Sequence, residues 1–222
     1  MSLLAMALTV LPFSQSAIEE IERAEQERLN ACIELVGKNP EDAYEEGLRW
    51  LGEGATPAAR YCTANALIGL GNYKEGAARL EELANAPDAG GEADRALYLA
   101  QSGNAWLTAG YPEAAVTTLT NALKLAPNDA DIRVDRAAAY LMNEKWEPAI
   151  ADLDQALARY PNDIEALRLR SRAHLNLENL DKAETDMSRA LFLDGRNVDT
   201  LVLRGDIRAA PAYRHYARRG TG

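Results

Sequence analysis

The side chains that could carry acid–base or nucleophilic chemistry are few and scattered in this chain of 222 residues. One of the two histidines, His174, occupies the position that Tyr140 holds 34 residues earlier, which favours packing over catalysis; the other, His215, lies near the C-terminus. The sequence has no glycine-rich phosphate loop, no His/Cys cluster at metal-ligand spacing and no nucleophile-elbow motif. We therefore expect a non-catalytic protein that carries no cofactor and no metal.

Neighbouring carboxylates also fail to form an acid–base pair. Glu81 and Glu82 are adjacent, and Asp152 and Asp154 are one residue apart, within segments whose apolar spacing predicts helices. Side chains at such spacings on a helix point in different directions. We interpret these carboxylates as part of a solvated helix face.

The charge of the chain is acidic and unevenly distributed. The formal net charge is −10. Residues 198–222 contain five arginines against two aspartates, a net charge of +3, which leaves −13 for the preceding residues. Nucleic-acid binding needs clustered lysine and arginine that displace counterions from phosphates. The composition therefore predicts no nucleic-acid partner, and the basic C-terminal segment is too short to change this.

The elements that position these side chains follow a pattern that recurs every 34 residues, and its clearest copy is residues 130–163. Apolar residues return at three- and four-residue steps on either side of a short break, which predicts two helices in each copy. Small residues recur at fixed places in both helices, where the close approach of two helix backbones requires them. They are Ala64, Gly103, Ala137 and Ser171 in the first helix, and Gly76, Ala115, Ala149, Ala183, Ala122, Ala156 and Ala190 in the second.

The period and these columns resemble the tetratricopeptide repeat over residues 57–197. The resemblance implies an all-α fold, a right-handed α-solenoid of stacked helix-turn-helix pairs, because a single pair cannot bury its apolar face. Repeats are predicted at residues 57–90, 96–129, 130–163 and 164–197, followed by a capping helix at 198–210 and a disordered basic tail at 211–222. The junction at residues 87–91 contains a proline and two glycines, so we expect it to be the most flexible joint.

The residues just before the first repeat depart from this pattern. Residues 18–56 predict two helices separated at Asn39 and Pro40, but the large Trp50 occupies a position that is normally small. The pair is either a degenerate repeat or an N-terminal cap. We favour the cap, because terminal repeats are usually atypical.

Residues 1–17 contain an apolar run, residues 3–11, that is followed by small residues. This order is typical of a signal peptide, although no basic residue precedes the run. We therefore predict a periplasmic or exported protein; the alternatives are an apolar leading helix that packs on the first pair and a cytoplasmic location. The run is too short to cross a bilayer, so no membrane span is predicted.

The two cysteines, Cys32 and Cys62, are candidates for one disulfide. Cys32 lies on the first long helix and Cys62 on the first helix of the following pair, and consecutive first helices stack side by side in a solenoid. In an exported chain, such a bond would tether the N-terminal pair. The alternative is two buried thiols that act as small hydrophobic side chains.

In the tetratricopeptide family the first helices line a concave groove, and the matching positions of this chain are the candidate peptide-binding site. They are Tyr61, Asn65, Asn104, Asp131, Arg168 and Arg172. The amides of Asn65 and Asn104 could bond an extended peptide backbone. Arg168 and Arg172, one helical turn apart, could hold a carboxylate.

The resemblance favours an interaction module that binds a peptide or helix of another protein. The basic clamp of the family's chaperone-binding members is absent, since the corresponding places hold Tyr61, Asp131 and Asp135, and this disfavours a chaperone adaptor. The alternative function is a self-associating scaffold or assembly factor of the bacterial cell envelope, which would form a homo-oligomer.

Overall fold

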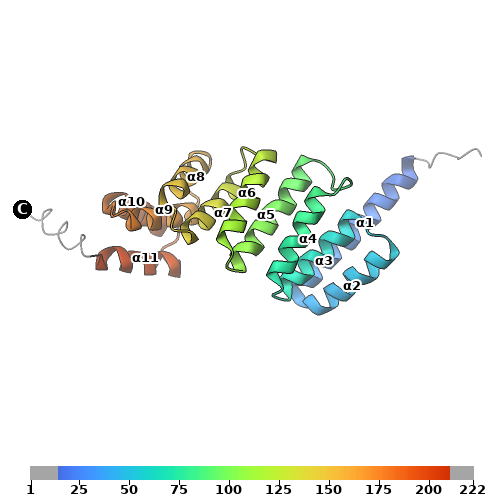
Figure 1. Cartoon of the computed structure of the whole chain (residues 1–222). Coiled ribbons are helices and arrows are strands. Elements are labelled where there is room, and N and C mark those ends of the chain that lie inside the picture. The colour runs from blue at the N-terminus through green and yellow to red at the C-terminus, as the bar shows by residue number, and fades with distance from the viewer. Residues whose placement is uncertain (1–14, 211–222) are drawn as a thin grey trace, which may run out of the picture.

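Helix-breaking residues divide residues 15–210, the part of the chain that the computed structural model describes, into eleven α-helices without a strand. The helices are α1 (Gln15–Lys38), α2 (Pro40–Glu53), α3 (Pro57–Gly69), α4 (Tyr73–Asn85), α5 (Glu92–Thr108), α6 (Pro112–Leu125), α7 (Ala130–Met142), α8 (Trp146–Arg159), α9 (Ile164–Asn176), α10 (Leu180–Leu193) and α11 (Val198–Ala209). Figure 1 shows them stacked in one elongated array from α1 to α11. The predicted all-α solenoid of helix pairs is confirmed.

Capping side chains and prolines set the boundaries of these helices. Proline stands in the first turn of α2, α3 and α6, where the missing N–H has no partner to lose. Five side chains accept a hydrogen bond from a backbone N–H in the first turn of the helix that follows them: Asn39, Thr56, Asp129, Asp163 and Asn197. Between the two helices of each repeat, one residue adopts a positive φ, and these residues are Gly71, Gly110, Glu144 and Glu178.

The small residues of the repeat columns lie where helices cross. Ala64, Ala137 and Ser171 have no exposed surface. A Cβ atom added to Gly103 would lie 2.4 Å from Cγ of Leu119 on α6. The small residues of the second helices are buried as well: Ala115, Ala149 and Ala183. Because any larger side chain would push the two backbones apart, these contacts confirm the predicted register of the columns.

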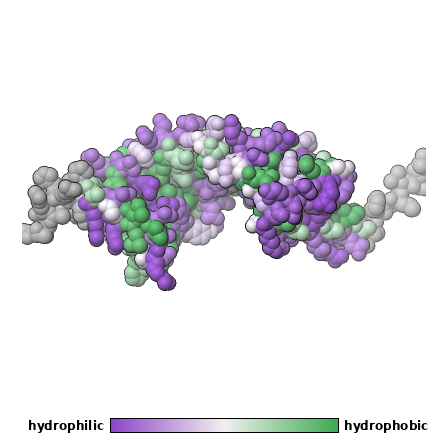
Figure 2. All heavy atoms as spheres, turned by 90° about the horizontal axis from the view of Figure 1, so that it is seen from below, coloured by the Kyte–Doolittle hydropathy of each residue, from purple (hydrophilic) through white to green (hydrophobic). Residues whose placement is uncertain are grey.

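The array is curved, with the first helices of the pairs on its inner side. Successive first helices contact one another directly at α5–α7, α7–α9 and α9–α11, whereas each second helix contacts mainly the first helices on either side of it. Helices on the inside of a curve approach more closely than those on the outside. Figure 2 shows the resulting arch, with a hollow between the two ends of the molecule.

The N-terminal pair, α1 and α2, joins the array through contacts of its own. Gly47 faces α3 so closely that a Cβ atom there would lie 2.6 Å from Oγ1 of Thr63. Trp50 is buried, and the guanidinium of Arg28 lies 4.6 Å from the centre of its ring. Because Gly47 provides the close approach, the large Trp50 is accommodated at a position that is small elsewhere.

The junction between the first two repeats is held by specific contacts. Helix α5 begins at Glu92, before the predicted start of the repeat at residue 96. The guanidinium of Arg95 donates hydrogen bonds to the carbonyl oxygens of Ala84 and Ala86, both at 2.9 Å, and Ala89 is fully buried. These contacts tie the segment to α4 and α5, so they do not support the expectation of a flexible joint.

At the C-terminal end, α11 packs Leu203 and Ile207 against Met187 of α10. The predicted basic tail and residues 1–14 of the predicted signal peptide lie outside the described residues. No helix within residues 15–210 combines the length and the apolar character needed to cross a membrane.

Candidate functional site

The candidate groove residues all lie on first helices, which form the inner side of the array. Tyr61 and Asn65 are on α3, Asn104 is on α5, Asp131 is on α7, and Arg168 and Arg172 are on α9. The rings of Tyr61 and Tyr98, on α3 and α5, have centroids 5.2 Å apart. Asn104 donates from Nδ2 to Oδ2 of Asp135 on α7 at 2.8 Å. These contacts link α3 to α5 and α5 to α7 at the candidate residues Tyr61 and Asn104.

The other candidates differ in how far they are already engaged. Asn65 donates to the backbone carbonyl of Tyr61 on its own helix, and Arg168 binds the carboxylate of Glu165 one turn earlier. Arg172 and Asp131 are exposed, and their side chains form no hydrogen bond or ion pair within residues 15–210. A ligand carboxylate could therefore bind Arg172 directly, but it would compete with Glu165 for Arg168.

Asp135 has an unusual protonation equilibrium for an aspartate. Burial raises its pKa to about 6, although the hydrogen bond from Asn104 opposes this shift. The nearby carboxylates of Asp131 and Asp129 raise the pKa further. The middle of the inner surface is therefore acidic at neutral pH and loses part of its charge at mildly acidic pH.

A second set of polar contacts lies on the outer side, in the grooves between successive second helices. Arg136 extends from α7 between α6 and α8. Its guanidinium donates to both carboxylate oxygens of Asp152 on α8, each at 2.7 Å, and to Oγ1 of Thr120 on α6 at 3.2 Å. Arg133 adds a longer contact to Asp152 at 3.4 Å. The α6–α8 groove is therefore filled by an arginine of the chain itself.

Arg170 repeats this arrangement in the α8–α10 groove. It donates to both carboxylate oxygens of Asp186 on α10, at 2.7 and 2.8 Å, and to Asp154 on α8 at 2.7 Å. Asp152 and Asp186 are only 3% and 5% exposed. The interpretation of Asp152 as part of a solvated face is wrong, because bidentate pairing with arginine offsets the burial of its charge. Asp154, in contrast, keeps an exposed side chain.

The groove between α4 and α6 is built from equivalent positions but has no arginine at the place of Arg136 and Arg170. Ser102 stands 34 residues before Arg136, and Thr118 stands 34 residues before Asp152. Glu81 of α4 extends into this groove instead. Its Oε1 accepts hydrogen bonds from Nε1 of Trp106 at 2.8 Å, from Oγ1 of Thr118 and from Oγ of Ser102 at 3.4 Å. The interpretation of Glu81 as a solvated carboxylate is therefore also wrong.

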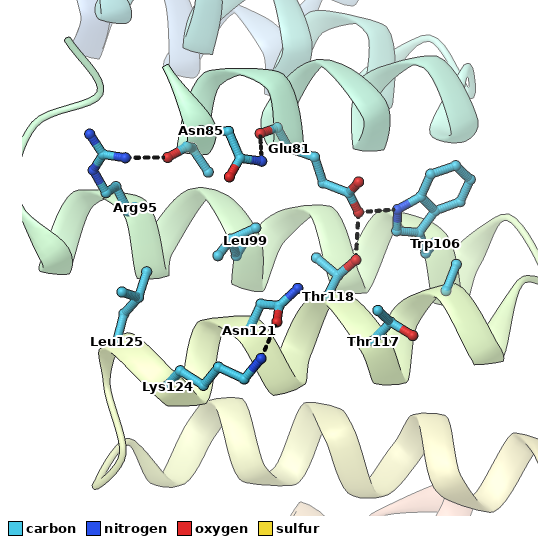
Figure 3. A pocket seen from close by; sticks show the side chains of 12 residues that line it. Glu81, Asn85, Arg95, Leu99, Trp106, Thr117, Thr118, Asn121, Lys124 and Leu125 are labelled. Carbon is cyan, nitrogen blue, oxygen red and sulfur yellow. Dashed lines mark hydrogen bonds between the residues drawn. The ribbon is translucent and has the colours of Figure 1, made fainter. Parts of the chain in front are cut away.

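An open cavity of about 600 Å³ remains in the α4–α6 groove. Figure 3 shows Glu81, Trp106 and Thr118 together at one end, with Leu99 behind the middle and Arg95, Lys124 and Leu125 toward the other end. The sequence contains evidence for this site. Residues 102, 136 and 170 occupy one repeat position and are Ser, Arg and Arg; residues 118, 152 and 186 occupy another and are Thr, Asp and Asp. A comparison of the polar columns between repeats would have found it.

His174 lies at the position expected for a packing residue. It is buried, and burial lowers its pKa, so the neutral imidazole is favoured. Within the described part of the chain, no group of three or more His, Cys, Asp and Glu residues is arranged to hold a metal ion.

Cys32 on α1 and Cys62 on α3 are joined by a disulfide, with their Cα atoms 6.0 Å apart. The bond links the off-pattern N-terminal pair to the first helix of the first repeat. Both residues are buried among Ala43, Trp50 and Ala59. The tether therefore lies within the core that the N-terminal pair shares with α3.

Comparison with known proteins agrees with this architecture. Residues 107–172 match the tetratricopeptide repeat family, and a search of curated proteins gave no match. The chain is similar to the tetratricopeptide domain of OM64 from Arabidopsis, with 26% identity over 53% of this chain and 98% of that one and a TM-score of 0.52. It is also similar to the second such domain of human RPAP3 in complex with the HSP70 peptide SGPTIEEVD, with 26% identity, coverage of 54% and 100%, and a TM-score of 0.51.

A longer match supports the fold over most of the chain. The MamA protein of Desulfovibrio magneticus RS-1 aligns with 78% of this chain and 97% of its own, with 19% identity and a TM-score of 0.66. The recurring small-residue columns, the stacked helix pairs and the match of residues 107–172 to the family together show that this chain has the tetratricopeptide repeat fold.

Proposed function

We propose that this protein is an interaction module whose inner surface, formed by α3, α5, α7 and α9, binds a peptide or helix of another protein. The observation that carries the proposal is that two candidate residues contact the neighbouring first helix, Tyr61 through Tyr98 and Asn104 through Asp135. Such contacts make one surface long enough for an extended ligand. The similarity to the RPAP3 domain, which holds a peptide in its structure, supports the same use.

The charges along the inner surface determine which kind of partner segment fits it. Aromatic and amide groups occupy α3 and α5, carboxylates occupy α7, and Arg168 and Arg172 occupy α9. The matching segment carries polar or apolar residues at one end and an acidic group near Arg172. A peptide with a uniformly acidic end would meet Asp131 and Asp135, so the partner belongs to a different class from the chaperone peptides.

The test reverses the charge at the basic end. Arg168→Glu/Arg172→Glu places like charges beside the partner's acidic group and should abolish capture of that partner from the native lysate. Arg189→Glu/Arg196→Glu is the matched control, because it changes the net charge equally at exposed positions outside α9. Circular dichroism melting of both variants checks the fold.

Loss of capture with an unchanged melting temperature supports the inner surface as the binding site. Equal capture by both double variants would move binding to the outer side or to the loops. A large loss of stability in the α9 variant alone would assign a structural role to these arginines, which would contradict the proposal.

A self-associating scaffold is the second candidate, and one observation favours it. The C-terminal end of the array exposes large apolar side chains: Phe192 is 89%, Val198 71% and Val202 55% exposed. A self-complementary apolar surface would produce a homo-oligomer. Size-exclusion chromatography with light scattering tests this candidate. A monomer at high concentration contradicts it, whereas an oligomer that Phe192→Ser converts to monomer supports it.

We also propose that the protein is exported, as the apolar run in residues 1–17 suggests. The disulfide is of a kind that persists in oxidising compartments. Ile18 and Ile21 are exposed at the start of α1, so cleavage near Ile18 would leave the packed part of this helix intact. Mature protein from the periplasmic fraction should begin near Ile18, and retention of Met1 in cytosolic protein would contradict export.

A further inference from the structure

The three outer grooves, α4–α6, α6–α8 and α8–α10, share one arrangement of helices, but an arginine fills only the last two. In the α6–α8 and α8–α10 grooves, an arginine from the intervening first helix, α7 or α9, lies between the two second helices. Its guanidinium is held from one side by Asp152 or Asp186 and from the other by Thr120 or Asp154. The grooves are therefore shaped and charged to hold a guanidinium.

The α4–α6 groove has a carboxylate, Glu81, but no cation at the position of Arg136 and Arg170. Glu81 stands at the position on α4 that corresponds to Thr120 on α6 and Asp154 on α8, which bind the arginines from the preceding second helix. Ser102, which replaces the arginine, has a single hydroxyl proton that is shared between the carbonyl of Ala77 at 2.9 Å and, more weakly, Oε1 of Glu81 at 3.4 Å. The space that an arginine side chain would occupy remains open.

The geometry points to an arginine side chain of a partner protein as the ligand of the α4–α6 groove, bound beside Glu81 and Trp106 in the place that Arg136 and Arg170 fill in the next two grooves. This site lies on the outer side and does not depend on the inner-surface proposal. The outer groove would thus recognise one arginine side chain of the partner.

The groups at the end of the cavity suit a guanidinium. All three donors to Glu81 bond its Oε1, so Oε2 has no donor among the described residues and is free to accept one from a ligand. The indole of Trp106 borders the same end of the cavity and offers a face for cation–π contact (Figure 3). Neutral hydroxyl and indole donors orient the carboxylate without neutralising its charge.

The other end of the cavity fixes the direction of the bound segment. Arg95 and Lys124 line this end. Arg95 donates to main-chain carbonyls, and Lys124 donates to Oδ1 of Asn121 at 2.8 Å. These positive charges disfavour a second cation there. The partner segment therefore places its arginine at Glu81 and a carbonyl or carboxylate group toward Lys124.

The test measures binding of the tripeptide acetyl-Gly-Arg-Gly-amide to the full chain by NMR. The indole N–H resonance of Trp106 reports on the site, because that N–H bonds Glu81; Trp106→Phe assigns it among the three tryptophans. We expect a saturable shift of this resonance with a Kd in the millimolar range, because only one side chain of the peptide contacts the groove. The citrulline and lysine counterparts should bind at least tenfold more weakly, since they lack the charge or the planar fork of arginine.

Two variants locate the binding. Glu81→Gln should weaken binding at least tenfold while its amide oxygen keeps the three internal donors, and Glu82→Gln, the exposed neighbour, should leave the Kd unchanged. Ser102→Arg/Thr118→Asp rebuilds the filled groove and should abolish binding without lowering the melting temperature. If this double variant fails to fold, the comparison of Glu81→Gln with Glu82→Gln still tests whether the peptide binds at Glu81.

Three results would overturn the proposal. One is no shift of the Trp106 resonance at millimolar tripeptide. Another is equal affinity for the arginine, lysine and citrulline peptides, which would show that the groove does not recognise a guanidinium. The third is unchanged arginine binding in Glu81→Gln, which would place the peptide elsewhere on the acidic surface.

Discussion

The outer grooves of the C-terminal repeats and the groove between α4 and α6 share one backbone arrangement and differ in what fills them. Arg136 and Arg170 close the C-terminal grooves with bidentate ion pairs. In the α4–α6 groove a serine stands in the same column, Glu81 takes neutral donors, and an open cavity of about 600 Å³ remains. A single column of the repeat therefore decides whether a groove serves as internal packing or as accessible surface.

The comparison also separates two ways of joining neighbouring repeats. In the C-terminal half, arginine links the second helices of successive repeats through charged hydrogen bonds. In the N-terminal half, a longer junction is held by Arg95 and by the buried Ala89, and a disulfide ties on the off-pattern pair. The regular half relies on a repeated ion pair, whereas the irregular half relies on contacts that occur once.

Asp152→Ala should produce the largest effect, because it leaves two partly buried arginines, Arg136 and Arg133, without their carboxylate. Removal of one partner from a buried ion pair costs about 3–5 kcal/mol of unfolding free energy. Thr118→Ala, at the equivalent position of the open groove, should cost about 1 kcal/mol, because Glu81 keeps two other donors. Chemical denaturation measures both. Equal losses would contradict the distinction between filled and open grooves.

Loss of the disulfide should have the next largest effect. Cys32→Ala/Cys62→Ala releases a loop with a sequence separation of 30 residues and should lower the unfolding free energy by about 2–4 kcal/mol. Reduction of the wild-type protein should give a similar loss in denaturant. The C-terminal end, which α11 closes by packing alone, provides no covalent equivalent among the described residues. Wild-type protein that is equally stable with and without reductant would contradict a structural tether.

The helices and their register could be predicted from the sequence because they depend on local patterns. Small residues such as Gly103 and Ala137 must stand where backbones cross, and residues such as Pro40 and Asp129 mark helix starts. The early start of α5 was missed because residues 92–95 lie outside the repeat pattern. Within this extension, Arg95 donates to carbonyl groups that lie about ten residues earlier on the other side of the loop.

The positions of the candidate groove residues followed from the repeat pattern, but their engagement did not. The pairing of Asn104 with Asp135 joins two repeats, so it depends on how the repeats stack rather than on local spacing. The inter-helix hydrogen bonds of Asp152 and Glu81 were missed for a related reason. Each carboxylate was considered against neighbours on its own helix, whereas its partners lie on other helices.

Ala149→Leu tests the packing that both halves share and should cost about 1–3 kcal/mol, because the fully buried methyl group leaves no room for three further carbons. Ala158→Leu on the same helix is the control, because residue 158 is exposed; this change should be close to neutral. Thermal melting measures both. An unchanged melting temperature for Ala149→Leu would contradict the register of the repeats.

The smallest effect concerns Asp135, which lies where the irregular α5 meets the regular α7 through Asn104. Burial raises its pKa to about 6, so between about pH 4 and 6 the folded state binds more protons than the unfolded state. The contribution of this group to stability is therefore fully present below pH 4 and is lost as the pH rises through 6. Asp135→Asn removes the charge, can still accept the bond from Asn104, and should raise stability at pH 7 by about 1–2 kcal/mol after allowance for the group's partial exposure.

The variant should also remove the part of the pH dependence of the unfolding free energy that falls between pH 4 and 6. Urea unfolding at several pH values measures this slope. Asp131→Asn, at the exposed neighbour, should only reduce it, because Asp131 makes a smaller contribution than burial to the raised pKa of Asp135. A carboxyl resonance of Asp135 that titrates near pH 4 would contradict the burial of this group. Asp135 and Asn104 join α7 to α5. An unchanged slope in Asp135→Asn would therefore show that the contact between these two helices is solvated. The inner surface would then be less continuous than the hydrogen bond between Asn104 and Asp135 implies.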